Sequence, residues 1–343
     1  MIPRVFGLVL KLAQEPDIDA SNYENRLGDP GSRTEALLHS QPTTPGKDAL
    51  MSRFSKISFA IIIFASSVAQ AEDSKEYLLR YKFVEGQVIR YEVSSRDDYV
   101  IKIGMDEDTP FSYQDSVKNY TVISVDKDGM ATLELMNMEW VKTHVNQNGQ
   151  QAEYDSRKNE EPEALFAPLA SMVGKKHLRV DLSATGDIEK IETLLNKDKE
   201  VKELAQDVLV KLPEEPVKVG GLWKEEVTVP LNLPGGSLKQ NIKLQRRYFI
   251  QSVKDGIAKI SMKTKVLTPL NNADLEIQLI RRQPEGTILF DLEKGLVISR
   301  EVSQNNQVVN FGQGASQMTF TQKHTEKLLP GDIASGESEA IQK

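Results

Sequence analysis

Apolar and polar residues alternate with a period of two through most of residues 77–328, which is the pattern of antiparallel strands with one buried face. The longest such run extends from Leu238 to Ser252, and a second follows from Ala258 to Val266. Apolar residues also alternate with acidic and amide side chains over residues 274–279, which predicts a further strand. The alternation therefore predicts a mostly β fold with helix as a minor component.

The turn between the first two of these strands determines how they pair. A three-residue loop, Lys254–Gly256, places Ile250 opposite Ile260 and keeps the apolar side chains on one face, whereas a two-residue loop would mix the faces. We therefore predict the three-residue loop, with its glycine in the left-handed conformation. Gly295 is expected at a freely solvated turn, so Gly256→Val should destabilise the fold more than Gly295→Val.

The same pattern occurs earlier in the chain. Tyr120–Leu133 matches Tyr248–Ile260, and Val180–Leu182 matches Phe290–Leu292, in the same order. In the earlier copy, the register places Val122 opposite Leu133. Chance similarity between short strands is the alternative, but two motifs in one order favour an internal duplication.

The fold class expected from these patterns is two tandem antiparallel β-meander, half-barrel-like repeats with one or two inserted helices. The first repeat is expected over residues 72–195 and the second over 214–329. Apolar residues at helical spacing predict a connecting helix over 196–213, and a weaker helix is predicted over 163–173. The small, polar residues 330–343 are expected to be a disordered tail.

Residues 51–71 have the composition of a secretory signal peptide. Two basic residues precede an apolar stretch, and a small-x-small motif ends at Ala71, directly before the acidic Glu72. A membrane anchor is the alternative, but the uncharged stretch Ile57–Ala71 has 15 residues, fewer than the ~20 that a spanning helix needs. We therefore expect an exported protein, periplasmic or extracellular, that is not integral to the membrane after cleavage. Residues 1–50 are expected to be an over-called or disordered extension.

The composition excludes several classes of chemistry. The chain of 343 residues has no cysteine, which excludes disulfides, thiolate metal sites and cysteine nucleophiles. Its formal net charge of -7 disfavours binding to nucleic acid. His144, His177 and His324 lack the spacing of metal ligands. We therefore assign no catalytic, cofactor-binding or metal-binding residue, and we expect that the protein is not an enzyme.

One predicted hairpin carries a basic strip on its polar face. The strip consists of Lys239, Lys243, Arg247, Lys259, Lys263 and Lys265. The strand predicted at residues 274–279 would place Glu276 opposite Lys265 and would neutralise part of the strip. A solvated, partly neutralised face is therefore favoured over an anion-binding site.

The strand from Met130 to Val141 is apolar on both of its faces. One face carries three large apolar side chains, Met136, Met138 and Trp140, in addition to the leucines of the other face. Such a face needs a cover or a ligand. A helix or loop, such as the helix predicted over 163–173, is favoured as the cover. A bound apolar ligand is the alternative, which makes these three residues candidate ligand-binding residues.

Three segments carry a resemblance to a known family: Leu79–Phe83, Gly86–Val93 and Leu212–Trp223, the last with the sequence LPEEPVKVGGLW. They resemble a family of secreted planctomycete proteins described only as a domain of unknown function, over residues 77–328. The resemblance implies no activity, cofactor or catalytic residue. More loosely, such meanders with inserted helices are similar to the half-barrel of lipoprotein-localisation carriers, which is an expectation about the fold alone.

These features lead to three hypotheses of function. The leading one is an exported, non-enzymatic protein of the bacterial cell envelope. It would bind an apolar or amphipathic, lipid-like ligand, or another exported protein, on a face of its sheet. The second is a purely structural or assembly component of the envelope. The third is a hydrolase-type enzyme, which is disfavoured because no convergent set of polar catalytic residues is visible.

The signal peptide gives a direct prediction about maturation. Protein isolated from the envelope fraction should begin at Glu72, because Ala69 and Ala71 suit the small-residue pockets of signal peptidase. N-terminal sequencing measures this. A mature protein that still carries residues 1–50 would contradict the prediction.

Overall fold

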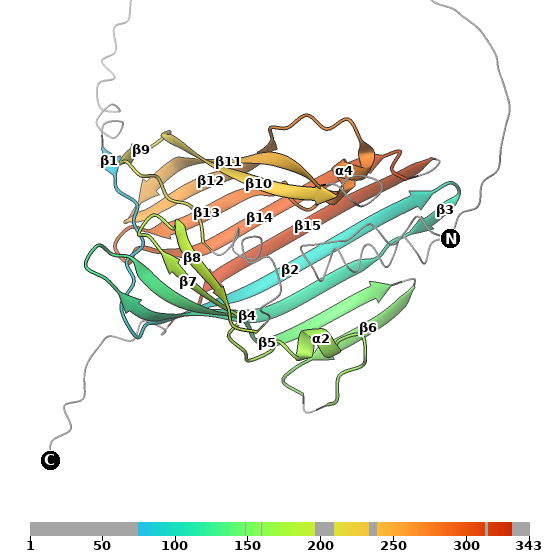
Figure 1. The fold of residues 1–343 in the computed structure, drawn as a ribbon, viewed down its shortest axis with the longest axis horizontal. Coiled ribbons are helices and arrows are strands. Elements are labelled where there is room, and N and C mark those ends of the chain that lie inside the picture. The colour runs from blue at the N-terminus through green and yellow to red at the C-terminus, as the bar shows by residue number, and fades with distance from the viewer. Residues whose placement is uncertain are drawn as a thin grey trace, which may run out of the picture.

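A computed structural model describes residues 75–147, 149–158, 160–195, 209–232, 239–312 and 315–330. Thirteen of the described strands form one antiparallel sheet (Figure 1), which confirms the mostly β, antiparallel fold class. The predicted signal peptide and its cleavage site lie outside the described residues. So do the N-terminal extension and almost all of the predicted tail.

The strands fall into two halves of the sheet and one separate pair. The first half contains β2 (Val88–Ile103), β3 (Asp106–Asp108), β4 (Phe111–Val125), β5 (Ala131–Gln147), β6 (Gln150–Asp155), β7 (Leu178–Leu182) and β8 (Ile188–Thr193). The second half contains β10 (Leu222–Asn232), β11 (Lys239–Lys254), β12 (Ile257–Val266), β13 (Glu285–Asp291), β14 (Leu296–Val309) and β15 (Ser316–Leu328). A separate two-stranded pair contains β1 (Glu76–Tyr77) and β9 (Val217–Lys218).

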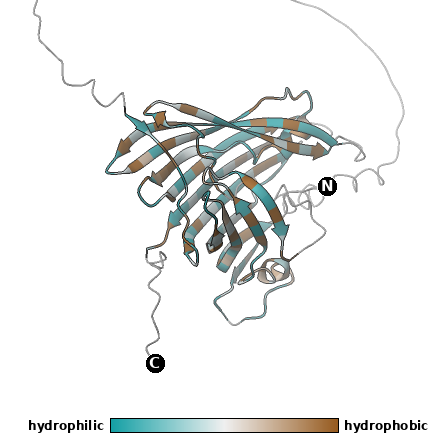
Figure 2. Cartoon of the chain, turned by 60° about the vertical axis from the view of Figure 1, so that its left-hand side comes forward, coloured by the Kyte–Doolittle hydropathy of each residue, from teal (hydrophilic) through white to brown (hydrophobic). Residues whose placement is uncertain are grey.

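The two halves meet where β15 pairs with β2. This antiparallel ladder runs from Ser316 opposite Ile103 to Leu328 opposite Tyr91. The strand order is therefore continuous, from β10 at one edge of the sheet through β15 and β2 to β8 at the other. Apolar and polar residues alternate along the strands (Figure 2), as expected for a sheet with one buried and one solvated face.

The register predicted for both hairpins is confirmed. Val122 of β4 lies opposite Leu133 of β5, and Ile250 of β11 lies opposite Ile260 of β12. A β-bulge follows at the same place in both hairpins, directly after Val122 and directly after Ile250. The matching bulges agree with the internal similarity of the two segments.

The predicted three-residue loop between β11 and β12 is wrong. Lys254 pairs with Ile257, so the turn contains only Asp255, with φ 50°, and Gly256, with φ 77°. Two successive residues with positive φ are the signature of a tight two-residue hairpin turn. The bulge at Gln251 supplies the extra residue that the apolar register requires.

The strand predicted over residues 274–279 is also wrong, because this segment forms the helix α4 (Ala273–Gln278). The Asn272 side chain caps it by accepting a hydrogen bond from the Asp274 amide at 2.7 Å. Two acidic residues in the first turn complement the partial positive charge of the helix N-terminus. The apolar residues of this segment therefore pack at helical spacing rather than alternating.

The other predicted helices are shorter or lie elsewhere. The weak helix over 163–173 is reduced to the four-residue α2 (Ala167–Ala170), with a proline in its first turn. Most of the helix predicted over 196–213 lies outside the described residues. Its described end, residues 209–213, is not helical. Leu212 instead donates its amide to the Thr185 carbonyl at 2.8 Å, beside the turn between β7 and β8.

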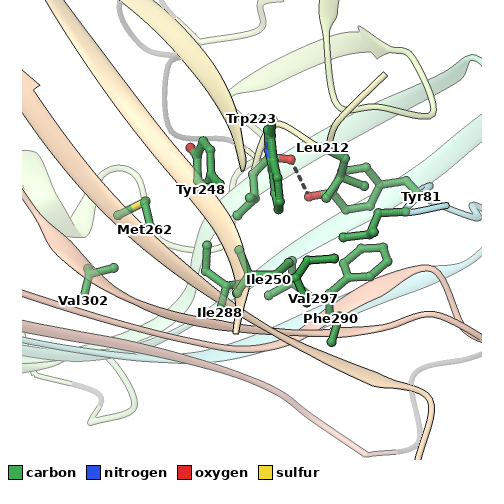
Figure 3. Packing of buried hydrophobic residues seen from close by; sticks show 14 residues of the cluster. Tyr81, Leu212, Trp223, Tyr248, Ile250, Met262, Ile288, Phe290, Val297 and Val302 are labelled. Carbon is green, nitrogen blue, oxygen red and sulfur yellow. Dashed lines mark hydrogen bonds between the residues drawn. The ribbon is translucent and has the colours of Figure 1, made fainter. Parts of the chain in front are cut away.

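The main core of the second half packs against the segment that contains Leu79 and Tyr81, near the N-terminal end of the described chain (Figure 3). Leu79 and Tyr81 are fully packed there with residues of β11, β12 and β13. The Tyr81 hydroxyl donates to the Val210 carbonyl at 2.9 Å, and the Trp223 indole donates to the Lys211 carbonyl at 2.8 Å. Two non-strand segments thus close this end of the sheet.

The packing of this segment reverses the expected order of the two turn glycines. A Cβ atom on Gly295 would lie 2.5–2.7 Å from atoms of Lys82 and Arg80, whereas one on Gly256 would meet nothing within 4 Å. Both glycines have positive φ. Gly295 is therefore the more constrained position, contrary to the sequence-based expectation.

We predict that Gly256→Ala lowers the free energy of unfolding by about 1 kcal/mol, the cost of a Cβ atom at positive φ. Gly295→Ala should lose a further ~1–3 kcal/mol, because backbone atoms of residues 80–82 would have to move. Urea unfolding of both variants measures the difference. Equal midpoints for the two variants would contradict the docking of this segment.

Candidate functional site

The inner face of the sheet is the face that carries Tyr91, Tyr120 and Tyr248. Its two ends are covered by other parts of the chain. At one end, Tyr81 and Leu212 pack on the apolar residues of β11–β13. At the other end, Ile277 and Ile280, from α4 and the turn after it, pack on the apolar residues of β2, β14 and β15.

Between these covered ends, the centre of the inner face is polar, and some of its side chains are partly exposed. Adjacent strands place Val302, His324, Ser95 and Gln114 in one row across β14, β15, β2 and β4. The three polar side chains of this row are intermediate in exposure, whereas Val302 is 3% exposed and belongs to the apolar core at one covered end. The central site consists of this row together with Val93, Lys118, Arg300, Gln322 and Glu326.

A buried ion pair lies at the edge of the central site. The Lys118 ammonium lies 2.8 Å from Glu326 Oε1, and both side chains are 12% exposed. His324 Nε2 lies 3.0 Å from the same oxygen. The Lys118 ammonium also lies 5.4 Å from the ring centroid of Tyr91 and 5.3 Å from that of Tyr120, within reach of cation–π attraction.

Each member of this ion pair stabilises the charged form of the other. Burial by itself raises the pKa of Glu326, but the Lys118 ammonium and the hydrogen bond from His324 outweigh it and hold that pKa well below its usual range. Burial likewise lowers the pKa of Lys118, but the charge of Glu326 outweighs it and leaves the pKa raised. Both groups are therefore charged at neutral pH.

A second cluster of polar side chains on the inner face lies on the strands β10 and β11. The Tyr248 hydroxyl donates to Glu225 Oε2 at 2.9 Å, and Arg246 lies 3.5 Å from the same carboxylate oxygen. Trp223 stacks on Tyr248, with ring centroids 5.5 Å apart. Burial raises the pKa of Tyr248, and the positive charge of Arg300 partly opposes this. The positive charge of Arg300 therefore acts on both clusters of the inner face, the one around Glu326 and the one around Tyr248.

A hydrogen-bonded network fixes the turn after α4 to the sheet. Asp97 accepts from Arg281 at 2.7 Å and from Gln322 at 2.8 Å. Gln304 donates to the Arg281 carbonyl at 3.0 Å and to Gln322 at 2.8 Å. These buried amide and carboxylate groups therefore have a structural role at the boundary between the central site and the covered end.

A serine and a histidine lie side by side in the central site. Ser95 lies opposite His324, but its hydroxyl donates to Asp97 at 3.2 Å, so the pair is not arranged as a nucleophile and its base. Among the described residues, no group of three or more acidic or histidine side chains could hold a metal ion. The site offers hydrogen-bond donors, acceptors and charges beside the apolar Val93 and Val302.

The structure does not bring Met136, Met138 and Trp140 together as a regular row. Asn119 pairs with Met136 and Val117 with Trp140, so three residues of β5 lie opposite the single Lys118. This bulge breaks the alternation on which the prediction depends. Met138 is 6% exposed, and its carbonyl accepts from Gly174 at 2.8 Å. Ligand binding by these three residues stays a prediction.

The carboxylate expected to neutralise part of the basic strip is wrong, although another one takes this role. Glu276 lies in α4 and not on a strand beside Lys265. The strand next to β12 is β13, which places Glu285 opposite Lys263. That carboxylate is 2.9 Å from the Lys263 ammonium.

Reasoning from the sequence missed the central site, although a signal for it is present. The side chains of Ser95 and Asp97 lie on the same face of β2 as those of the apolar Tyr91, Tyr99 and Ile101. In β15, the polar residues 322, 324 and 326 likewise continue the parity of Met318 and Phe320. Polar residues at the inward-facing positions of two long strands indicate a solvent-accessible stretch on a face that is otherwise buried.

Comparisons with known proteins identify a family match over part of the chain. A family model described as "Family of unknown function (DUF6263)" matches residues 195–297. This region includes the segment 212–223, and the match agrees with the expected class of uncharacterised domain. Among curated proteins, none matches the chain.

One solved structure with a weak similarity is the Salmonella SPI-1 type III secretion injectisome secretin InvG, residues 176 to the end, in the open gate state. The TM-score is 0.15 at 9% identity, and the alignment covers 75% of this chain and 65% of the secretin chain. The chain thus spans slightly less than two thirds of that structure. Within the described residues, no helix is long and apolar enough to cross a membrane.

We predict that Lys118→Met lowers the free energy of unfolding by ~3–5 kcal/mol at neutral pH, because it leaves Glu326 buried without its cation. Since the pKa of Glu326 is lowered on folding, the ion pair stabilises the protein above the carboxyl's usual pKa and less as the pH falls below it. The difference between wild type and Lys118→Met should therefore shrink in acid.

Lys102→Met is the matched control, because Lys102 is 48% exposed and pairs with Glu107 at 3.0 Å on the surface. Lys102→Met should lower the free energy of unfolding by about 1 kcal/mol or less at any pH. Denaturant unfolding at several pH values measures both variants. Equal costs for Lys118→Met and Lys102→Met would mean that the inner ion pair is effectively solvated.

Proposed function

We propose that this protein is an exported, non-enzymatic binding protein of the bacterial envelope that holds an amphipathic ligand at the central site. The observation that carries the proposal is the polar centre of an inner face whose two ends are apolar and covered: Ser95, Gln114 and His324 are partly exposed there, beside the buried Glu326. A centre that served only as core would be apolar and closed like those ends.

The charges of the inner face favour a ligand with an anionic polar group. Four cations lie at or beside the central site, Lys118, Arg246, Arg281 and Arg300, against three carboxylates, Asp97, Glu225 and Glu326. These cations give the partly desolvated inner face an electrostatic attraction for an anionic group.

Apolar side chains beside these charges suit the other part of an amphipathic ligand. Val93 and Val302 share the central rows, and Met262 is buried two strands from Val302. A methionine adapts its shape to irregular apolar groups. Export rests on the predicted signal peptide at residues 51–71.

The ligand proposal is tested by filling the site. Ser95→Phe places a ring in the centre of the inner face, whereas Thr321→Phe places the same ring on exposed β15 at the outer face. Wild type and Thr321→Phe should bind the anionic apolar dye anilinonaphthalene sulfonate equally. Ser95→Phe should bind it at least tenfold more weakly, since ~1.4 kcal/mol of lost contact has that effect.

Native mass spectrometry of protein purified without detergent complements the dye titration. A co-purifying mass should be present on wild type and absent from Ser95→Phe. Equal dye binding by both phenylalanine variants would place the ligand elsewhere. Absence of both dye binding and a co-purifying mass in wild type would favour a purely structural role in the envelope.

A further inference from the structure

The outer face of strands β10–β12 carries a row of like charges. Register places Lys224 of β10 opposite Arg247 of β11, and Arg247 opposite Lys263 of β12. All three side chains are exposed. Like charges directly opposite one another on neighbouring strands destabilise a sheet. The arrangement therefore costs stability in the isolated protein.

The surrounding residues relieve only part of this charge: Glu285 of β13 lies 2.9 Å from the Lys263 ammonium. Lys243, Lys259 and Lys265 are exposed on the same face. Within the described part of the chain, these three and Lys224 form no ion pair with a carboxylate. The exposed carboxylates on the neighbouring positions are Glu226 of β10 and Glu285 of β13. This concentration of positive charge occurs in a chain whose net charge is -7.

An apolar pair lies beside the charged row. Leu222 of β10 lies opposite Phe249 of β11, one row along from Lys224 and Arg247 on the same face. Leu222 is 52% exposed and Phe249 is 37% exposed. Basic side chains around exposed apolar ones are the combination found at surfaces that bind the headgroup region of anionic membranes.

We propose that this cationic surface, defined by Lys224, Arg247, Lys263, Leu222 and Phe249, docks on a membrane surface of anionic lipid headgroups. The basic side chains neutralise lipid phosphates, and the apolar pair enters the interface between headgroups and acyl chains. A soluble polyanion would use the charges but leave the apolar pair in water, so the pair favours lipid. The surface lies on the opposite face of the sheet from the central site, and the inference does not depend on that site.

The experiment uses sedimentation with vesicles of phosphatidylcholine alone and with added phosphatidylglycerol. The protein should bind only the anionic vesicles, and binding should weaken from about 0.05 M to about 0.5 M salt. The triple variant Lys224→Gln/Arg247→Gln/Lys263→Gln should bind about a hundredfold more weakly, because each basic side chain near an anionic surface contributes roughly a factor of five. Phe249→Ser should also weaken binding.

The matched control changes three basic residues elsewhere on the outer face, Lys102→Gln/Lys323→Gln/Lys327→Gln, and should retain vesicle affinity within twofold. Circular dichroism establishes that both triple variants are folded. Equal loss in the two triple variants, or equal binding to both vesicle types, would overturn the proposal. Unchanged vesicle binding by Phe249→Ser, with equal affinity of wild type for dextran sulfate, would instead identify a general polyanion site.

Discussion

The arrangement of this protein depends on how the inner face of one long sheet is covered. Strand β2 has 16 residues, and at ~3.4 Å per residue such a strand extends over ~54 Å. The elements that pack on the inner face are short: α4 with the turn after it, and the segment around Tyr81 with residues 209–213. They cover the two ends. The polar middle between them keeps Ser95, Gln114 and His324 partly exposed, beside the buried Glu326.

The segment around Tyr81 also relates the two similar halves of the sheet. The Tyr81 amide donates to the Ala184 carbonyl in the β7–β8 turn, at 2.8 Å. The Lys82 amide donates to the Gly295 carbonyl in the matching β13–β14 turn, at 3.2 Å. A single extended segment thus binds equivalent turns of both halves, and the β15–β2 ladder joins the same halves edge to edge. This double connection makes the sheet one structural unit.

Much of the fold could be predicted from the sequence, because the face of a strand on which a residue lies follows from the local alternation of apolar and polar residues. The opposition of Val122 to Leu133, and of Ile250 to Ile260, follows from keeping apolar side chains on one face. The bulge that separates Met136 from Trp140 adds residues without any strong sequence signal. In the segment of α4, alternation and helical spacing coincide, and the Asn272 cap decides in favour of the helix. The central site could not be predicted because it requires β15 beside β2. Asp97 and Gln322 are 225 residues apart in sequence and hydrogen-bonded in the structure.

The central claim is that the middle of the inner face is open while its ends are closed. Because the chain has no cysteine, a single introduced thiol reports on one position without background labelling. Ser95→Cys, in the middle, should react with a maleimide within about tenfold of the rate of the exposed Thr321→Cys. Ile101→Cys, at a covered end where the isoleucine is 4% exposed, should react only through unfolding. A Ser95→Cys thiol as unreactive as that of Ile101→Cys, in a protein shown to be folded, would contradict the account.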